Sequence, residues 1–274
     1  MAALRSELSK LYRMRITWAS FGVVLLLVGL ITWGSHHEQD HLDVDREFGS
    51  QFIVAGKTVT ALFIANVALQ VALVVLVPLL IAVVVGGLIA GERQTGSLRM
   101  LLSRPVARWK VLIAKLAASW AYAVTVTLFI GLCGLGLGQL VFGWGDLVVL
   151  RGGLTIFDPQ TGLLRMAYAY GLGCLAMCSV AAVTLLLSAI VNNPMTAAGL
   201  SVASLLVSGI VAEMPYFESI KPHLLTSHLD VHREVLVVSI ERADVVSSVT
   251  YLAGYLVVAA VIALIVFERR DVTC

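Results

Sequence analysis

The chain has 274 residues, of which 59% are hydrophobic and only 13% are charged, and its formal net charge is +2. A soluble domain usually carries about 25% charged residues, so this composition excludes an ordinary soluble enzyme or binding domain. Lipid admits only helices and closed barrels, because every backbone polar group must be satisfied within the protein. The apolar runs are continuous rather than alternating, and we therefore predict an all-α membrane protein.

Long uncharged stretches follow one another along the chain, and every Lys, Arg, Asp and Glu falls between them. A span needs roughly 20 apolar residues, and each stretch reaches that length. The longest stretch is interrupted at Asn192, Asn193 and Pro194, so it predicts two spans joined by a short turn. We expect one domain, 1–274, with six spans at about 16–35, 60–90, 116–142, 166–191, 194–212 and 245–267.

The first 15 residues precede the first span and have their own pattern. Leu4, Leu8 and Leu11 recur at helical spacing, and the basic residues lie away from them. This pattern is typical of an amphipathic helix that lies in the membrane surface. We predict such an interfacial helix over residues 1–15.

The charges of alternate gaps predict the orientation. One set of gaps holds twelve Lys and Arg residues and four acidic residues. The other set holds seven Lys and Arg residues and thirteen acidic residues. Cytoplasmic loops are enriched in Lys and Arg. We therefore predict that both termini and the 92–115 gap are cytoplasmic and that the acidic 213–244 gap is extracytoplasmic.

The 92–115 gap has features beyond its basic charge. Apolar Leu residues between the charges indicate a short helix with one apolar face, and Pro105 indicates its end, because the residue before a proline avoids the helical conformation. Arg108, Lys110 and Lys115 are expected at the inner headgroups. Charge alone would equally suit an ordinary basic loop, but the Leu face favours a helix that docks on a soluble partner.

Residues 90–115 resemble the signature of permeases of the type-2 exporter superfamily of ABC transporters. That signature has an acidic residue at the end of the second span, then Gly-Thr or Gly-Ser, a Leu-rich turn, Ser-x-Pro-Val-x-Arg and a Lys that opens the third span. The matching residues are Glu92, Gly96, Ser97, Leu98, Leu101, Leu102, Ser103, Pro105, Val106, Arg108 and Lys115.

The resemblance implies a permease subunit that couples ATP hydrolysis to export across the inner membrane. The chain has no Gly-x-x-x-x-Gly-Lys-Ser/Thr loop, so we expect no enzyme activity or cofactor in it, and ATP and Mg²⁺ on a separate ATPase. The implied partners are two copies of the ATPase and a second copy of the permease, with which this chain would form a homodimer. No nucleic acid is implied. The resemblance extends to permeases that serve copper-enzyme maturation. The alternative is a mechanotransmitting anchor of the same fold that signals to an extracytoplasmic partner without moving cargo.

The polar and small residues inside the spans allow two interpretations. Asn66, Gln70 and Gln139 are candidates to line a path, or they join helices through amide hydrogen bonds. The Gly134–Gly138 run and the Gly87/Gly91 pair predict close helix packing.

All six histidines lie in the two large outer gaps. These histidines suit either a metal relay or solvated polar loops, and the loops are favoured because no Cys or Met cluster accompanies the histidines. His228 and His232 have zinc-helix spacing, but no Glu follows His228. Cys174 and Cys178, one turn apart, are interpreted as buried apolar residues. We predict no metal site.

Overall fold

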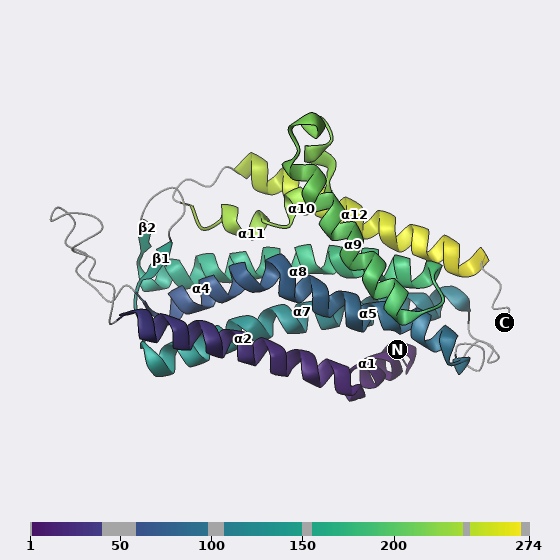
Figure 1. Cartoon of the computed structure of the whole chain (residues 1–274), viewed down its shortest axis with the longest axis horizontal. Helices are drawn as coiled ribbons and strands as arrows, with labels where there is room; N and C mark the ends of the chain where they lie inside the picture. Colours follow the sequence, from purple (N-terminus) through teal and green to yellow (C-terminus); the bar gives the residue numbers. More distant parts are fainter. Residues whose placement is uncertain (1, 40–58, 98–106, 150–154, 238–241, 270–274) are drawn as a thin grey trace.

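The computed structural model of the chain describes residues 2–39, 59–97, 107–149, 155–237 and 242–269. It is an elongated bundle in which most long helices run along a common axis (Figure 1). Six described helices are long and apolar enough to cross a membrane, which confirms the predicted number. The elements are α1 (Ala2–Arg13), α2 (Arg15–Gln39), α4 (Ala61–Val71), η1 (Ala72–Leu76), α5 (Val77–Gln94), α7 (Arg108–Val141), β1 (Leu147–Val149), β2 (Thr155–Phe157), α8 (Pro159–Ile190), α9 (Pro194–Glu213), η2 (Pro215–Phe217), η3 (Lys221–His223), α10 (Leu225–His228), α11 (Val231–Glu234) and α12 (Arg242–Arg269).

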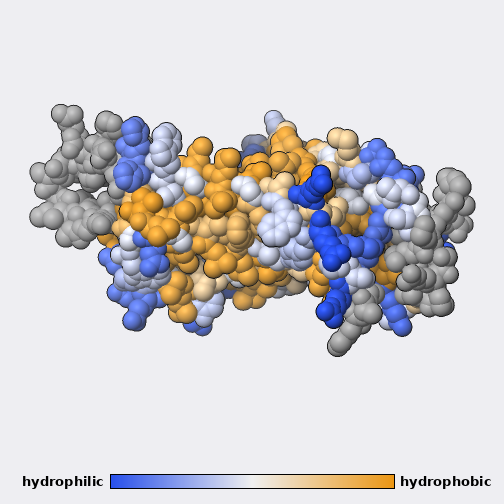
Figure 2. Space-filling model, turned by 90° about the horizontal axis from the view of Figure 1, so that it is seen from below, coloured by the Kyte–Doolittle hydropathy of each residue, from blue (hydrophilic) through white to orange (hydrophobic). Residues whose placement is uncertain are grey.

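The two ends of this bundle differ in the charge of their residues. The basic end comprises α1, the end of α5, the start of α7 and the α8–α9 turn; the acidic end comprises residues 142–149, 155–158 and 214–237. Figure 2 shows hydrophobic surface across the middle of the molecule and hydrophilic residues gathered toward both ends. An apolar belt between polar ends is the surface expected of a helical bundle that spans a bilayer.

The predicted N-terminal helix is present as α1, and the chain turns sharply between α1 and α2. The Thr17 hydroxyl donates to the carbonyl of Leu11 at 2.7 Å, and the Trp18 indole N–H donates to that of Tyr12 at 3.0 Å. These bonds satisfy carbonyls left open at the end of α1. The turn lays α1 against α7, where Leu11 is fully buried.

The second span is a single long helix with one irregular turn. Thr60 caps it: its hydroxyl oxygen accepts from Phe63 N at 3.2 Å and donates to the carbonyl of Asp146 at 2.8 Å. α4 and α5 are joined by η1, a π-helical turn over Ala72–Leu76. Such turns insert one extra residue into a helix and occur frequently at functional sites.

The glycine run of α7 packs as predicted. A Cβ at Gly134 would lie 2.8 Å from Ala65 Cα, and one at Gly138 would lie 2.8 Å from Ala61 Cα. Glycine is therefore required for the contact between α4 and α7, whereas Gly136 has nothing within 4 Å of its Cβ position.

The prediction that Gly87 and Gly91 of α5 pack closely against another helix was wrong, and the glycine that does so is one residue earlier. Gly87 and Gly91 have nothing within 4 Å, whereas a Cβ at Gly86 would lie 3.1 Å from Ala198 N of α9. Spacing alone identifies small residues, but the orientation of the helix decides which of them meets a neighbour.

Helix α8 lies at the centre of the described bundle and packs against α5, α7, α9, α11 and α12. By contrast, α9 and α12 are the least buried spans. Exposed apolar side chains on both helices, such as Leu206 and Val257, therefore face lipid or another protein chain.

A short β-hairpin lies at the acidic end and was not predicted. β1 and β2 pair antiparallel, with Leu147 opposite Phe157. The guanidinium of Arg165 lies 4.1 Å from the ring centre of Phe157 and donates to the carbonyls of Val235 and Val237. The hairpin is thereby joined to the segment that follows α11.

Candidate functional site

Four charged side chains form a closed network at the basic end. The Lys115 ammonium of α7 lies 3.0 Å from Glu7 Oε2 of α1 and 2.8 Å from Glu92 Oε2 of α5. Lys10 of α1 lies 3.1 Å from the other carboxylate oxygen of each acid. Two acids and two ammonium groups therefore neutralise one another where three helices meet.

Burial explains why this network is complete. The Lys115 side chain is fully buried, and it also donates to the carbonyl of Leu88 at 3.0 Å. An isolated ammonium would be very costly there, so it requires paired carboxylates and hydrogen bonds. Lys115 was expected at the headgroups; that expectation was wrong, because its side chain points into the bundle toward α1 and α5.

The surroundings shift the pKa values of the two α1 residues. Burial raises the pKa of Glu7, but Lys115 and Lys10 outweigh burial and hold it below its ordinary value. Burial lowers the pKa of Lys10, but the hydrogen bond to Glu7 and the charge of Glu92 hold it above its ordinary value. Both shifts favour the charged forms of Glu7 and Lys10.

A second set of contacts joins α5 to the α8–α9 turn. Arg93 donates to the carbonyls of Ala189 and Val191, both at 3.1 Å, and to Asn192 Oδ1 at 3.3 Å. One turn earlier, the Ser188 hydroxyl donates to the carbonyl of Gly86 at 2.7 Å. The end of α5 and the turn are thus held together as one unit.

The α8–α9 turn lies where the sequence predicted it. α8 ends at Ile190, and α9 begins at Pro194, with the side chain of Asn193 accepting from Met195 N at 2.8 Å. Proline suits the first helical position because the N–H it lacks would have no helical partner. Met195 is 83% exposed at the tip of the turn, so the turn presents an apolar side chain.

The predicted ATPase-coupling residues lie only partly within the described structure. Glu92 belongs to the network, and Gly96 follows the end of α5 with a φ of 72°, which favours glycine. The Ser97 hydroxyl donates to the carbonyl of Glu92, and Arg108 at the start of α7 donates to that of Glu268 at 3.3 Å. The remaining residues lie outside the described ranges: Leu98, Leu101, Leu102, Ser103, Pro105 and Val106.

The three predicted path residues are not all brought together. Gln70 donates to Asn66 Oδ1 at 2.9 Å, and both line a cavity of about 270 Å³ on α4 that also includes Arg233 of α11. Gln139 is exposed on α7 and does not line this cavity.

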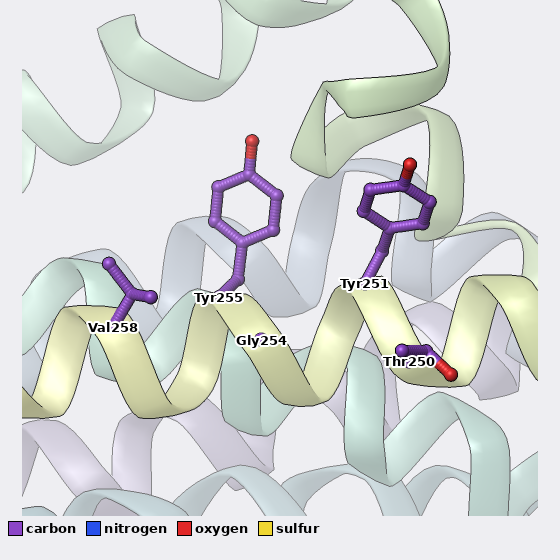
Figure 3. A pocket seen from close by; sticks show the side chains of 5 residues that line it. All are labelled: Thr250, Tyr251, Gly254, Tyr255 and Val258. Carbon is purple, nitrogen blue, oxygen red and sulfur yellow. The ribbon is translucent and has the colours of Figure 1, made fainter.

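Histidines and tyrosines attach the acidic end to α12. The His228 ring stacks on Tyr251 with centroids 4.6 Å apart, and its nitrogens lie 3.1 Å from Ser248 Oγ and 2.8 Å from the carbonyl of Pro222. Figure 3 shows Tyr251 and Tyr255 projecting to the same side of α12, beside a pocket of about 260 Å³. His228 is therefore an anchoring residue within the described structure.

Sequence reasoning did not find the parts of the network that lie on α1. A usable signal was present: Glu7 is three residues after Leu4 and four before Leu11, so it lies on the apolar face of α1. An acid on an apolar face requires a buried cationic partner, but nothing in the sequence pattern identified Lys115 as that partner.

Comparison with known proteins gives two findings. The sequence matches the family described as "ABC-2 family transporter protein" over residues 1–272. It is also 24% identical over 206 residues to "Uncharacterized protein YhcI" of Bacillus subtilis (strain 168), covering 72% of this chain and 65% of that protein. The family match spans nearly the whole chain and agrees with the six apolar helices. The chain therefore belongs to the ABC-2 family of transporter proteins.

Proposed function

We propose that this chain is the permease subunit of an ATP-binding-cassette exporter and that a separate ATPase docks on its basic end. Two connections between spans lie at that end: the segment between α5 and α7 and the α8–α9 turn. The observation that supports the proposal most directly is that side-chain bonds hold the spans together beside both connections. Arg93 joins the α8–α9 turn to α5, and the Lys115 network joins α5 to α7 and α1. A push on either connection would therefore move several helices together.

Force transmission needs stiff contacts where the motor pushes. The segment 95–107 begins three residues after Glu92 and ends eight residues before Lys115. Both of its flanking helices are thus held close to its ends by one buried network. The exposed Met195 gives the second turn an apolar contact for the same partner.

The proposed assembly follows from this docking surface. Two ATPase chains bind ATP and Mg²⁺ and contact two copies of the permease, which form a homodimer. Because ATP is cytoplasmic, the basic end and both termini face the cytoplasm, in the inner membrane of the cell. The excess of Lys and Arg in the gaps on that side supports this orientation.

Two aspartate substitutions at opposite ends of α9 test the docking surface. Met195→Asp should release the ATPase, because a carboxylate replaces the apolar tip of the turn, whereas Met214→Asp at the other end should retain it. Leu101→Asp should act like Met195→Asp. The measurement is the ATP hydrolysis that co-purifies with a tagged chain from its native membrane. Equal ATPase retention by all three variants would contradict docking at the basic end.

One observation favours a second candidate, the mechanotransmitting anchor. The segment 214–237 packs on three spans, because α10 contacts α9 and α12, and α11 contacts α8. Motion of the spans would therefore reach an extracytoplasmic partner bound there. Under this candidate, replacing 224–237 by a Gly/Ser linker preserves ATPase assembly but removes a protein that cross-links to the segment in wild-type cells. Absence of any such cross-linked protein in the wild type would count against it.

A further inference from the structure

We propose that a groove on the second span, at its acidic end, binds an amphiphile with an anionic headgroup. Two cavities of about 540 Å³ and 270 Å³ adjoin there, and Gln70 and Arg233 line both. The identification of this amphiphile as cargo rests on the proposed export function. The binding site itself rests on the geometry of the groove.

The larger cavity supplies an apolar wall along the helix. Its lining residues other than Gln70 and Arg233 are Leu27, Val71, Val74, Val75, Leu76 and Leu79. Val74 and Val75 lie within the π-helical turn and are 55% and 65% exposed. A continuous apolar strip of this kind suits a hydrocarbon tail, which gains free energy by covering it.

The smaller cavity supplies the polar end of the groove. Asn66 is buried and accepts from Gln70, so the amide pair is held in place on α4. Arg233 reaches this pair from α11, which belongs to a different part of the chain. The apolar strip therefore ends at two amides and a guanidinium.

Arg233 has a donor that the described part of the chain does not satisfy. Its terminal nitrogen NH1 lies 3.2 Å from Asp230, but Nε is buried and has no hydrogen-bond partner among the described residues. Asp230 lines neither cavity, and no acidic residue is among those that do. The cationic side chain of Arg233 lines both cavities, and none of their lining residues is acidic, so the groove favours a carboxylate or phosphate oxygen from a ligand.

The depth of the groove also agrees with a headgroup. The second span is a 34-residue helix, which at about 1.5 Å per residue exceeds a bilayer core of about 30 Å. Gln70 lies nine residues from its acidic end, so the polar part of the groove lies near the boundary of the core. Arginine is favoured at that level, where it pairs with anionic groups. The tail would extend along Val74 and Val75 toward the middle of the membrane.

The ligand experiment uses spin-labelled stearate and its methyl ester. The purified chain in a nonionic detergent is titrated with each probe, and immobilised probe is measured by electron paramagnetic resonance. Stearate should bind about tenfold more tightly than the uncharged ester, because only the carboxylate carries the negative charge that pairs with Arg233. Phosphatidylglycerol, phosphatidylcholine, unlabelled stearate and inorganic phosphate serve as competitors. Competition by phosphatidylglycerol identifies a phospholipid source, and competition by stearate alone identifies a fatty acid.

Matched variants locate the site. Arg233→Gln should remove the preference for stearate over the ester, whereas Arg233→Lys should keep part of it and Arg242→Gln, an exposed control, should keep all of it. Val75→Trp should weaken both probes by filling the strip. Val83→Trp, on an exposed part of α5 outside the groove, should not.

Several results would overturn the proposal. They are equal binding of acid and ester to the wild type, equal effects of the Arg233 and Arg242 variants, and efficient competition by inorganic phosphate alone. Cross-linking of two copies through Val75→Cys, in a chain without its other cysteines, would instead make the groove an interface between copies. The assay contains no ATP and no ATPase, so its failure leaves the proposed ATPase coupling intact, and loss of ATPase docking leaves the binding result intact.

Discussion

The two ends of this bundle are held together by different chemistry. At the basic end, three helices converge on the fully buried Lys115 and its carboxylate partners. At the acidic end, short helices rest on α12 through the stacked ring of His228 and its hydrogen bonds, and Arg165 of α8 donates to carbonyls of the segment after α11. Buried charges tolerate little rearrangement, because separating them leaves an unpaired ion. The comparison indicates a rigid basic end and an acidic cap that can separate from its spans at lower cost.

The largest expected effect comes from breaking the network. Lys115→Met leaves the carboxylates of Glu7 and Glu92 without their buried partner and should destabilise the chain by about 3–5 kcal/mol. Lys110→Met, at an exposed position on the same helix, should change little. Thermal unfolding in detergent, followed by tryptophan fluorescence, measures both. Adding Glu7→Gln to Lys115→Met should restore part of the loss, and an absence of any restoration would contradict the pairing.

Close packing near the acidic end should respond to volume rather than charge. Gly138→Leu places a side chain where a Cβ alone would lie 2.8 Å from Ala61 Cα, so we expect a cost of at least about 1–3 kcal/mol. Gly136→Leu, two residues away, meets nothing within 4 Å and should be tolerated. The same unfolding assay compares them. If the two variants unfold at the same temperature, the α4–α7 contact is not as close as described.

The acidic cap should loosen without unfolding the bundle. His228→Ala removes the ring stacked on Tyr251 and two hydrogen bonds, at a local cost of about 1–2 kcal/mol. We expect faster proteolysis of residues 214–237 and an almost unchanged unfolding temperature. His223→Ala, at an exposed ring beside the same tyrosine, is the control and should have the smaller effect. A large fall in unfolding temperature for His228→Ala would mean that the two ends are equally integral.

The smallest expected effect is the pH dependence of stability, which comes from the charged network at the basic end. The pKa of Glu7 is lowered in the folded chain, so its contribution is present above the ordinary value of 4.5 and is lost as pH falls below it. The pKa of Lys10 is raised, so its contribution is present below the ordinary value of 10.5 and is lost as pH rises above it. The unfolding temperature of the wild type should therefore decline below about pH 4.5 and above about pH 10.5. In Glu7→Gln, the decline at acid pH should be smaller. An identical acid decline in that variant would show that other groups cause it.

The sequence determined the features that depend on local composition. Five uncharged stretches, the longest of them interrupted by a turn, are sufficient to predict six spans, since each helix in lipid must satisfy its own backbone and exclude charge from its length. The turn at Asn192–Pro194 was also predictable, because asparagine favours the cap of a helix and proline favours its first turn wherever they occur. Glycines 134 and 138 were correctly identified as packing residues, although their partners on α4 were not.

The tertiary structure alone decided which distant groups meet. Glu7, Glu92 and Lys115 are far apart in the chain, and each is compatible with an exposed basic loop until the turn at Met14 lays α1 against α7. Gly86 rather than Gly87 contacts α9, because helix rotation depends on all of its neighbours together. Arg233 and Gln70 line the same cavities only after α11 packs against α8. Periodicity reports which side of a helix is apolar, but contacts between helices depend on their rotation and crossing, which no single segment encodes.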